Sequence, residues 1–228
     1  MDANQIARQL NAVRERIEAA ARRAGRDPRS VRLVAASKTQ PALAIRAAYA
    51  AGARDFGENY VQEALSKRAE LSDLSDVRWH LIGHLQTKKA RIAAGAFDLV
   101  QSLDSIRLAD ALAKARPDPP IAVLVEVNLG GEASKTGVPP DEVEALINAV
   151  RAKVEVRGLM AIPPPASNPE HSRTYFVQLR GLRDRLAAAA GFALSDLSMG
   201  MSDDFEIAIE EGATIVRVGR AIFGERPQ

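Results

Sequence analysis

Short apolar runs alternate with longer amphipathic stretches along almost the whole chain. The apolar runs occupy residues 31–37, 54–57, 77–83, 97–103, 121–128, 156–162, 194–200 and 214–219. The stretches between several of them, such as residues 41–52, 58–71, 105–115 and 140–150, have the spacing of helices. Near-continuous apolar strands that alternate with helices are typical of a parallel sheet covered by helices.

Eight strands joined by helices predict an α/β fold, a single (β/α)8 TIM-type barrel. Residues 1–27 precede the first strand and predict an extra N-terminal helix packed on the barrel, with Ile6, Leu10, Val13 and Ile17 on its apolar face. Ser105 is a candidate helix N-cap, and Gly95 stands where a helix C-cap is expected. A doubly wound open sheet is the alternative fold. Because no linker divides the chain, residues 1–228 are interpreted as one domain.

The composition narrows the classes of function. The chain has 228 residues, 31 Lys plus Arg against 29 Asp plus Glu, no Cys and three His. The absence of Cys excludes disulfides and thiolate chemistry, and the sparse His argues against a metal site. No basic tract, signal peptide or long apolar segment is present, which argues against nucleic acid and membrane as partners and favours a cytoplasmic protein.

In a barrel of this kind the loops that follow the strands build the functional site, so polar residues at those positions are candidates. They are Lys38, Glu58, Asn59, His84, Asn128, Met160 (a late strand position), residues 198–202, Arg217, Gly219 and Arg220. Lys38 is the first of them, because the sequence VRLVAASKTQP places a lysine at the end of a strand that is otherwise apolar.

The segments SMGMSDD and VRVGRAIFG predict a phosphate site. The first carries hydroxyls at Ser198 and Ser202 and a flexible backbone at Gly200, and the second carries Gly219 and Arg220 at the start of a short helix. Barrels often bind phosphate after strands seven and eight. The segment GGEASKTG is only superficially similar to a nucleotide phosphate loop, because Ser134 stands where that loop has a glycine.

Arg217 lies between Val216 and Val218, so it points into the barrel if the two valines face the helices. A buried guanidinium needs an acceptor, and one interpretation is an ion pair with a carboxylate such as Glu126. The other interpretation is functional. A lysine that forms a Schiff base, a phosphate clamp and an inward arginine are together what pyridoxal 5'-phosphate (PLP) needs, with the arginine beside the pyridine nitrogen. An arginine there disfavours protonation of that nitrogen and makes the ring a weak electron sink.

Seven motifs follow one another from about Val31 onward: ASKTQP, FGENYVQE, WHLIGHLQ, SKTG, GLMAIPP, SMGMSDDFEIAI and VRVGRAIFG. In these motifs and their order the chain resembles a known family, the PLP homeostasis proteins, which are PLP-binding proteins of the alanine racemase N-terminal-domain type. Gln40 and Lys88 depart from the family pattern, which often has Lys and Asn there.

The resemblance implies a covalent aldimine between PLP and Lys38. It further implies that Asn59 and Met160 lie near the ring, that Ser202, Gly219 and Arg220 clamp the phosphate, and that Arg217 meets the pyridine nitrogen. It suggests a role for Lys135 in cofactor exchange. The implied function is PLP homeostasis, by buffering or carrying the cofactor for PLP-dependent apoenzymes, with no established reaction and no catalytic residue.

Two other functions remain as alternatives. A PLP-dependent racemase needs a second acid/base on the other face of the ring, commonly a tyrosine from an additional domain, and Tyr49, Tyr60 and Tyr175 do not fall at suitable strand ends. A Schiff-base aldolase that acts on a phosphorylated sugar would use Lys38 and the phosphate loops but leaves Arg217 without a role. No long exposed apolar stripe is evident, which favours a monomer, with a weak dimer as the alternative.

Overall fold

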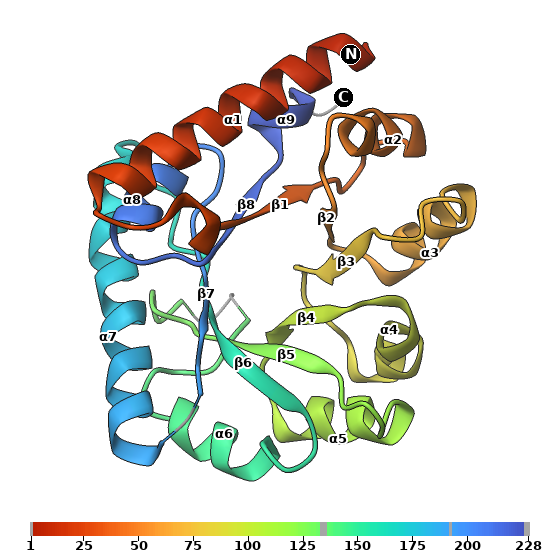
Figure 1. Cartoon of the computed structure of the whole chain (residues 1–228). Helices are drawn as coiled ribbons and strands as arrows, with labels where there is room; N and C mark the ends of the chain where they lie inside the picture. The colour runs from red at the N-terminus through yellow and green to blue at the C-terminus, as the bar shows by residue number, and fades with distance from the viewer. Residues whose placement is uncertain (1, 133–135, 192, 226–228) are drawn as a thin grey trace.

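Eight parallel strands close into a barrel in the computed structural model (Figure 1). The structure describes residues 2–132, 136–191 and 193–225. The strands are β1 (Arg32–Ala36), β2 (Asp55–Glu58), β3 (Arg78–Leu81), β4 (Leu99–Leu103), β5 (Ala122–Glu126), β6 (Glu155–Met160), β7 (Asp196–Ser198) and β8 (Ile215–Val218). Each strand pairs with the next, and β8 pairs with β1 from Arg32 opposite Ile215 to Ala35 opposite Val218. The predicted barrel is therefore confirmed, and the open sheet is wrong.

The helices surround the barrel, and the first of them is additional to the repeating units (Figure 1). They are α1 (Ala3–Arg23), α2 (Ala42–Ala50), α3 (Val61–Glu70), α4 (Ala90–Ala96), α5 (Ile106–Ala115), α6 (Val143–Val150), α7 (Arg173–Ala190), α8 (Phe205–Glu210) and α9 (Arg220–Phe223). The helix α1 contacts α2, α8 and α9, and buries the predicted apolar face of Ile6, Leu10, Val13 and Ile17.

The two helix-end signals have different outcomes. Ser105 is the N-cap of α5, where its Oγ accepts a hydrogen bond from the N–H of Leu108 at 3.3 Å, as predicted. The prediction that Gly95 caps a helix is wrong, because α4 continues to Ala96. The helix instead ends at Phe97, whose extended backbone leads into β4.

Side chains alternate between the inside of the barrel and the layer beneath the helices. Val216 and Val218 belong to the large outer core, whereas Ile215 packs inside the barrel with Val34, Leu99, Ala122, Leu124 and Met160. Arg217 therefore shares the inward side with Ile215, as the pleat predicts. The barrel interior is thus partly apolar, and Arg217 introduces a buried charge into it.

Neither a membrane span nor a metal cluster is found in the part of the chain that the structure describes. None of its helices is long and apolar enough to cross a membrane. Within the same residues, no group of three or more acidic, histidine or cysteine side chains is arranged to hold a metal ion.

Candidate functional site

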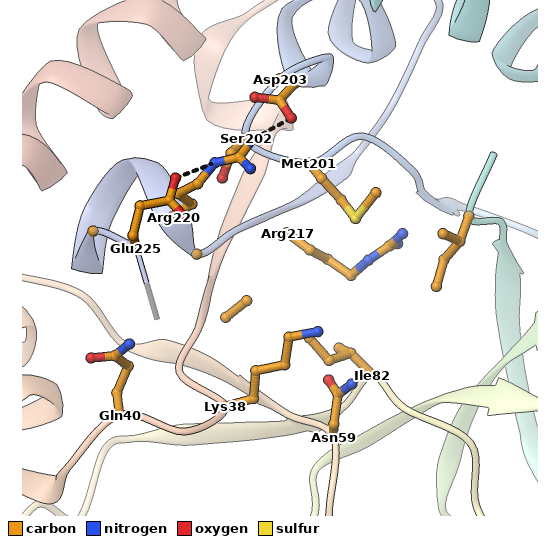
Figure 2. A pocket seen from close by; sticks show the side chains of 14 residues that line it. Lys38, Gln40, Asn59, Ile82, Met201, Ser202, Asp203, Arg217, Arg220 and Glu225 are labelled. Atoms are coloured by element: carbon orange, nitrogen blue, oxygen red, sulfur yellow. Dashed lines mark hydrogen bonds and ion pairs between the residues drawn. The ribbon is translucent and has the colours of Figure 1, made fainter. Parts of the chain in front are cut away.

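A cavity of about 510 Å³ opens at the carboxyl ends of the strands, on the side between β1, β2 and β8. Its lining residues are Ala36, Lys38, Gln40, Asn59, Ile82, Ile162, Met201, Ser202, Asp203, Arg217, Gly219, Arg220, Gly224 and Glu225. In Figure 2, Lys38 and Asn59 lie on one side of the cavity, with Arg217 across from them and Arg220 farther out. The volume lies in the range of small-molecule sites.

Lys38 lies just beyond the strand rather than in it. The strand β1 ends at Ala36, one residue before the end of the predicted run 31–37, so the half-buried Lys38 side chain comes from the first loop of the barrel. This position explains how a lysine can follow a buried strand, because its amine reaches the cavity without entering the apolar core. Asn59 follows β2 in the same way and lines the cavity beside it.

A buried ion-pair cluster holds the backbone on both sides of Lys38. The Nζ atom of Lys67 donates to the carbonyl oxygen of Ser37 at 2.7 Å, to Oε1 of Glu58 at 2.7 Å and to Oε1 of Glu63 at 2.6 Å. The hydroxyl of Ser37 also donates to Oε1 of Glu58, at 2.6 Å. The residue on the other side, Thr39, donates its N–H to Oε1 of Glu63 at 2.5 Å. Lys67 and Glu63 therefore tie the two neighbours of Lys38 to α3.

The cluster maintains two unfavourable features. Thr39 has a φ of +66°, a left-handed conformation that β-branched residues rarely adopt. Burial raises the pKa of the Glu58 carboxyl, although hydrogen bonds from Lys67 and Ser37 act in the opposite direction. Strain and a buried charge persist only where the surroundings compensate for them, and here both lie beside Lys38.

Arg217 forms the deep wall of the cavity and is almost completely buried, with 3% of its surface exposed. Its Nη1 donates to Oγ of Ser198 at 2.5 Å and its Nη2 donates to the carbonyl oxygen of Ala161 at 3.0 Å. Burial lowers the pKa of the guanidinium to about 10, so it stays charged at neutral pH. Among the described residues no carboxylate is in ion-pair contact with Arg217, so the predicted direct ion pair does not form: Oε1 of Glu126 accepts from Thr136 instead. The negative charges of Asp204 and Glu126 still favour the charged guanidinium and raise its pKa, against the effect of burial.

The outer part of the cavity is formed by the loops after β7 and β8. The Oγ of Ser202 accepts a hydrogen bond from the N–H of Ala221 at 3.3 Å, which joins the two loops. The Arg220 guanidinium donates to Asp203 and lies 3.6 Å from Oε1 of Glu225 (Figure 2). A Cβ at Gly219 would lie 2.9 Å from the carbonyl oxygen of Ala36, so only glycine lets β8 and β1 approach this closely.

The structure brings together six of the nine predicted site residues: Lys38, Asn59, Ser202, Arg217, Gly219 and Arg220 line one cavity. Met160 packs in the apolar barrel interior, and Ser198 lies behind Arg217. Gly200 has a φ of +91° and accepts a hydrogen bond from the N–H of Arg217 at 3.0 Å. These three residues support the wall of the cavity and are not among its lining residues.

The two residues that depart from the family pattern lie in different parts of the molecule. Gln40 lines the cavity, whereas Lys88 lies in a short helical turn, Thr87–Lys89. Lys135 lies outside the described residues. Six lining residues were not among the predicted candidates: Ala36, Ile82, Ile162, Asp203, Gly224 and Glu225. All of them lie within the quoted motifs or, for Glu225, directly after one, so position at the end of a strand or in the loop that follows is the signal that would have found them.

The fold and the cavity define the class of protein. It is a (β/α)8 barrel of the type described as the alanine racemase N-terminal domain, and that family matches residues 9–227. A pyridoxal phosphate homeostasis protein from Pseudomonas aeruginosa is 49% identical over 225 residues, covering 97% of this chain and 96% of the relative. The chain therefore belongs to the pyridoxal phosphate homeostasis protein family, and the resemblance seen in the motifs is confirmed.

Solved structures agree with this assignment. PipY of Synechococcus elongatus, solved with PLP bound, is 40% identical with a TM-score of 0.85, covering 96% of this chain and all of that chain. Alanine racemase from Corynebacterium glutamicum is 21% identical with a TM-score of 0.75, and the match covers 99% of this chain but 62% of the racemase. The second likeness shows a shared fold alone.

Proposed function

We propose that the protein binds PLP in the cavity between Lys38 and Arg220 and serves PLP homeostasis as a reversible holder of the cofactor. The observation that carries this proposal is that Lys38, Arg217, Arg220 and Ser202 line one cavity. An amine, two guanidinium groups and a hydroxyl suit a small anionic ligand that also carries an aldehyde and a ring nitrogen. The PLP-bound state of PipY supports the choice of ligand.

Each residue would have a separate task. Lys38 would supply the amine for a covalent bond to the aldehyde carbon, and Asn59 beside it would contact the ring. Arg217 would donate a hydrogen bond to the ring nitrogen and keep it unprotonated, because a buried cation disfavours a second positive charge nearby. Ser202, Gly219 and Arg220 would bind the phosphate. When bound, PLP supplies an electron-accepting ring, which an unprotonated nitrogen weakens.

The phosphate end of the cavity favours reversible binding over maximal affinity. Arg220 interacts with Asp203 and Glu225, and the side chains of all three are exposed. A phosphate must compete with these two carboxylates for the guanidinium, because like charges repel and the arginine has a limited number of donors. Replacing Asp203 with asparagine is therefore expected to tighten PLP binding and to slow its release to a PLP-dependent apoenzyme.

The geometry gives less support to racemisation. A racemase needs acid/base groups on both faces of the ring, and no tyrosine lines the cavity among the described residues. Tyr49 instead donates to Asp76 at 2.5 Å, and Tyr60 lies on the surface. The aldolase alternative leaves the buried Arg217, directly opposite Lys38, without a partner on the substrate.

The test is covalent trapping of added PLP by borohydride, followed by peptide mass spectrometry. The label is expected on Lys38, and Lys38→Ala is expected to abolish it, whereas Lys153→Ala, on a surface ion pair with Asp110, keeps it. A label spread over surface lysines, or one retained in Lys38→Ala, would contradict the proposed site. Turnover of alanine enantiomers by the loaded protein, measured in parallel, would favour the racemase.

A further inference from the structure

A chain of hydrogen bonds crosses the barrel interior behind the cavity. Nη1 of Arg217 contacts Oγ of Ser198 at 2.5 Å, and that Oγ contacts Oε1 of Gln101 at 2.6 Å. Nε2 of Gln101 then contacts Nδ1 of His80 at 3.1 Å, and Nε2 of His80 contacts Oδ1 of Asp55 at 2.9 Å. The chain thus runs from the cavity wall, through β8, β7, β4 and β3, to the first residue of β2.

Every member of this chain is buried. Asp55 is 5% exposed and His80 2%, and Gln101 and Ser198 are fully buried. The outer neighbours on the same strands, such as Trp79 and Val100, belong to the core beneath the helices, so the polar members point into the barrel. Buried polar groups are costly unless their hydrogen bonds are complete, and completing them requires all five side chains together.

The two ends of the chain fix the position of every proton between them. A guanidinium only donates, so Ser198 must accept from Arg217 and direct its own hydrogen to Oε1 of Gln101. The amide nitrogen of Gln101 therefore faces Nδ1 of His80, which must be an acceptor. The remaining imidazole proton lies on Nε2 and is donated to the Asp55 carboxylate. All four bonds point the same way, from a cation to an anion.

The anionic end is itself held in place. Arg78 donates to both carboxylate oxygens of Asp55, at 2.8 and 2.6 Å. Burial alone would raise the pKa of this carboxyl, but the hydrogen bonds from Arg78 and His80 outweigh it and keep the pKa well below its usual range. Asp55 is therefore a permanent acceptor, and it determines the direction of the chain from the far end.

We propose that Gln101 and His80 are positioning residues that orient Arg217 toward the ring nitrogen of the bound cofactor through this one-directional chain. The inference rests on the proposed function, because the ring nitrogen is the group that Arg217 would meet. Neither Gln101 nor His80 lines the cavity. Their effect on the ligand therefore passes through Ser198 and Arg217. Loss of either is expected to leave Nη2 of Arg217 bonded to Ala161 but to release the hydroxyl of Ser198, so that Nη1 is no longer held in one orientation.

The decisive experiment compares two ligands: PLP and its carbocyclic analogue, in which a C–H replaces the ring nitrogen. Gln101→Met keeps the size of the side chain and removes both hydrogen bonds, and it is expected to weaken binding of PLP about tenfold. It is expected to change binding of the analogue little, because the analogue has no nitrogen for Arg217 to meet. Ser102→Ala is the matched control, since Ser102 is equally buried on β4 but donates to the carbonyl oxygen of Gly83, outside the chain.

A second pair of variants covers the case in which Gln101→Met does not fold. His80→Asn keeps an acceptor at the position of Nδ1 and loses the donor to Asp55, whereas His80→Gln keeps that donor and loses the acceptor for Gln101. The loss of preference for PLP over the analogue is expected to be greater for His80→Gln, which breaks the chain nearer to Arg217. Nitrogen-15 NMR of the unliganded wild-type protein is expected to show His80 protonated at Nε2 alone.

The possible results separate the inference from the function on which it rests. Equal weakening of both ligands in Gln101→Met would overturn the inference and leave a purely structural role for the chain. A His80 proton at Nδ1 would overturn it as well, because the chain would then point the other way. Failure of the wild-type protein to bind PLP would instead overturn the proposed function. Equal binding of both ligands by the wild type would contradict the proposed contact between Arg217 and the ring nitrogen.

Discussion

Replacing Lys67 with methionine is expected to destabilise the barrel strongly. The Lys67 side chain is 7% exposed and the side chain of its partner Glu58 is fully buried. Methionine has a similar length but cannot donate, so it would leave the Glu58 carboxylate without its cation and the carbonyl oxygen of Ser37 without a donor. Removal of one partner of a buried ion pair costs about 3–5 kcal/mol, which corresponds to roughly 6–20 °C in the unfolding temperature for a chain of this size.

The pH dependence of the destabilisation shows whether the unpaired carboxylate of Glu58 is its cause. The pKa of Glu58 is already raised, chiefly by burial, and the loss of Lys67 would raise it further. A carboxyl whose pKa is higher in the folded than in the unfolded protein contributes stability below its unfolded pKa and loses that contribution as pH rises through the folded pKa. The difference in the free energy of unfolding between wild type and Lys67→Met is therefore expected to shrink on acidification and to grow toward neutral pH.

Urea unfolding of four proteins measures this effect: wild type, Lys67→Met, Glu58→Gln and the double variant. The double variant is expected to recover more than half of the loss, because glutamine removes the buried charge and still accepts from Ser37. A loss of less than about 1 kcal/mol in Lys67→Met, the size of a surface pair, or no recovery in the double variant would refute the reasoning.

Three further predictions of stability are checked by the same unfolding measurements, and one prediction of affinity is checked by PLP titration. Gly158→Ala is expected to cost several kcal/mol or to prevent folding, because its Cβ would lie 1.8 Å from the carbonyl oxygen of Asp196 in the neighbouring strand; a loss below about 1 kcal/mol would contradict it. Ser105→Ala, which removes the N-cap of α5, is expected to cost about 1 kcal/mol. Thr39→Gly is expected to stabilise the fold by about 0.5–1 kcal/mol, because it relieves a left-handed β-branched residue, while it weakens PLP binding by loosening the loop around Lys38.

The strands could be predicted from the sequence because a strand buried on both faces is apolar over its whole length. Each of the eight predicted runs overlaps a strand of the structure, and the differences lie at the ends. Most runs continue into a loop, whereas β2 extends one residue beyond its run, to Glu58, and β6 begins one residue before its run, at Glu155. The strand before Lys38 is an example, since Ser37 and Lys38 already belong to the loop. Gly95 was misread because a glycine near a helix end does not reveal how far the helix continues.

The supports of the site could not be predicted in the same way. Asp55, His80, Gln101 and Ser198 lie in four different strands, and nothing local shows that they meet, because they are up to 143 residues apart. Lys67 has the spacing of an ordinary helical surface residue, and its burial follows from the docking of α3 against β2. Closure of the barrel is what brings these residues together, so their partnership belongs to the tertiary structure.

The two ends of the cavity differ in how firmly their charged groups are held, and this difference fits a protein that must both retain and release a ligand. Lys38 lies between residues fixed by a buried ion-pair cluster, and Arg217 is the end of a buried hydrogen-bond chain. Within the described part of the chain, the partners of Arg220 are exposed carboxylates that solvent and salt screen. The inner groups are therefore preorganised and add little ordering cost on binding, whereas the outer group must exchange one anion for another. Affinity can thus be lowered at the phosphate end without disturbing the geometry at Lys38.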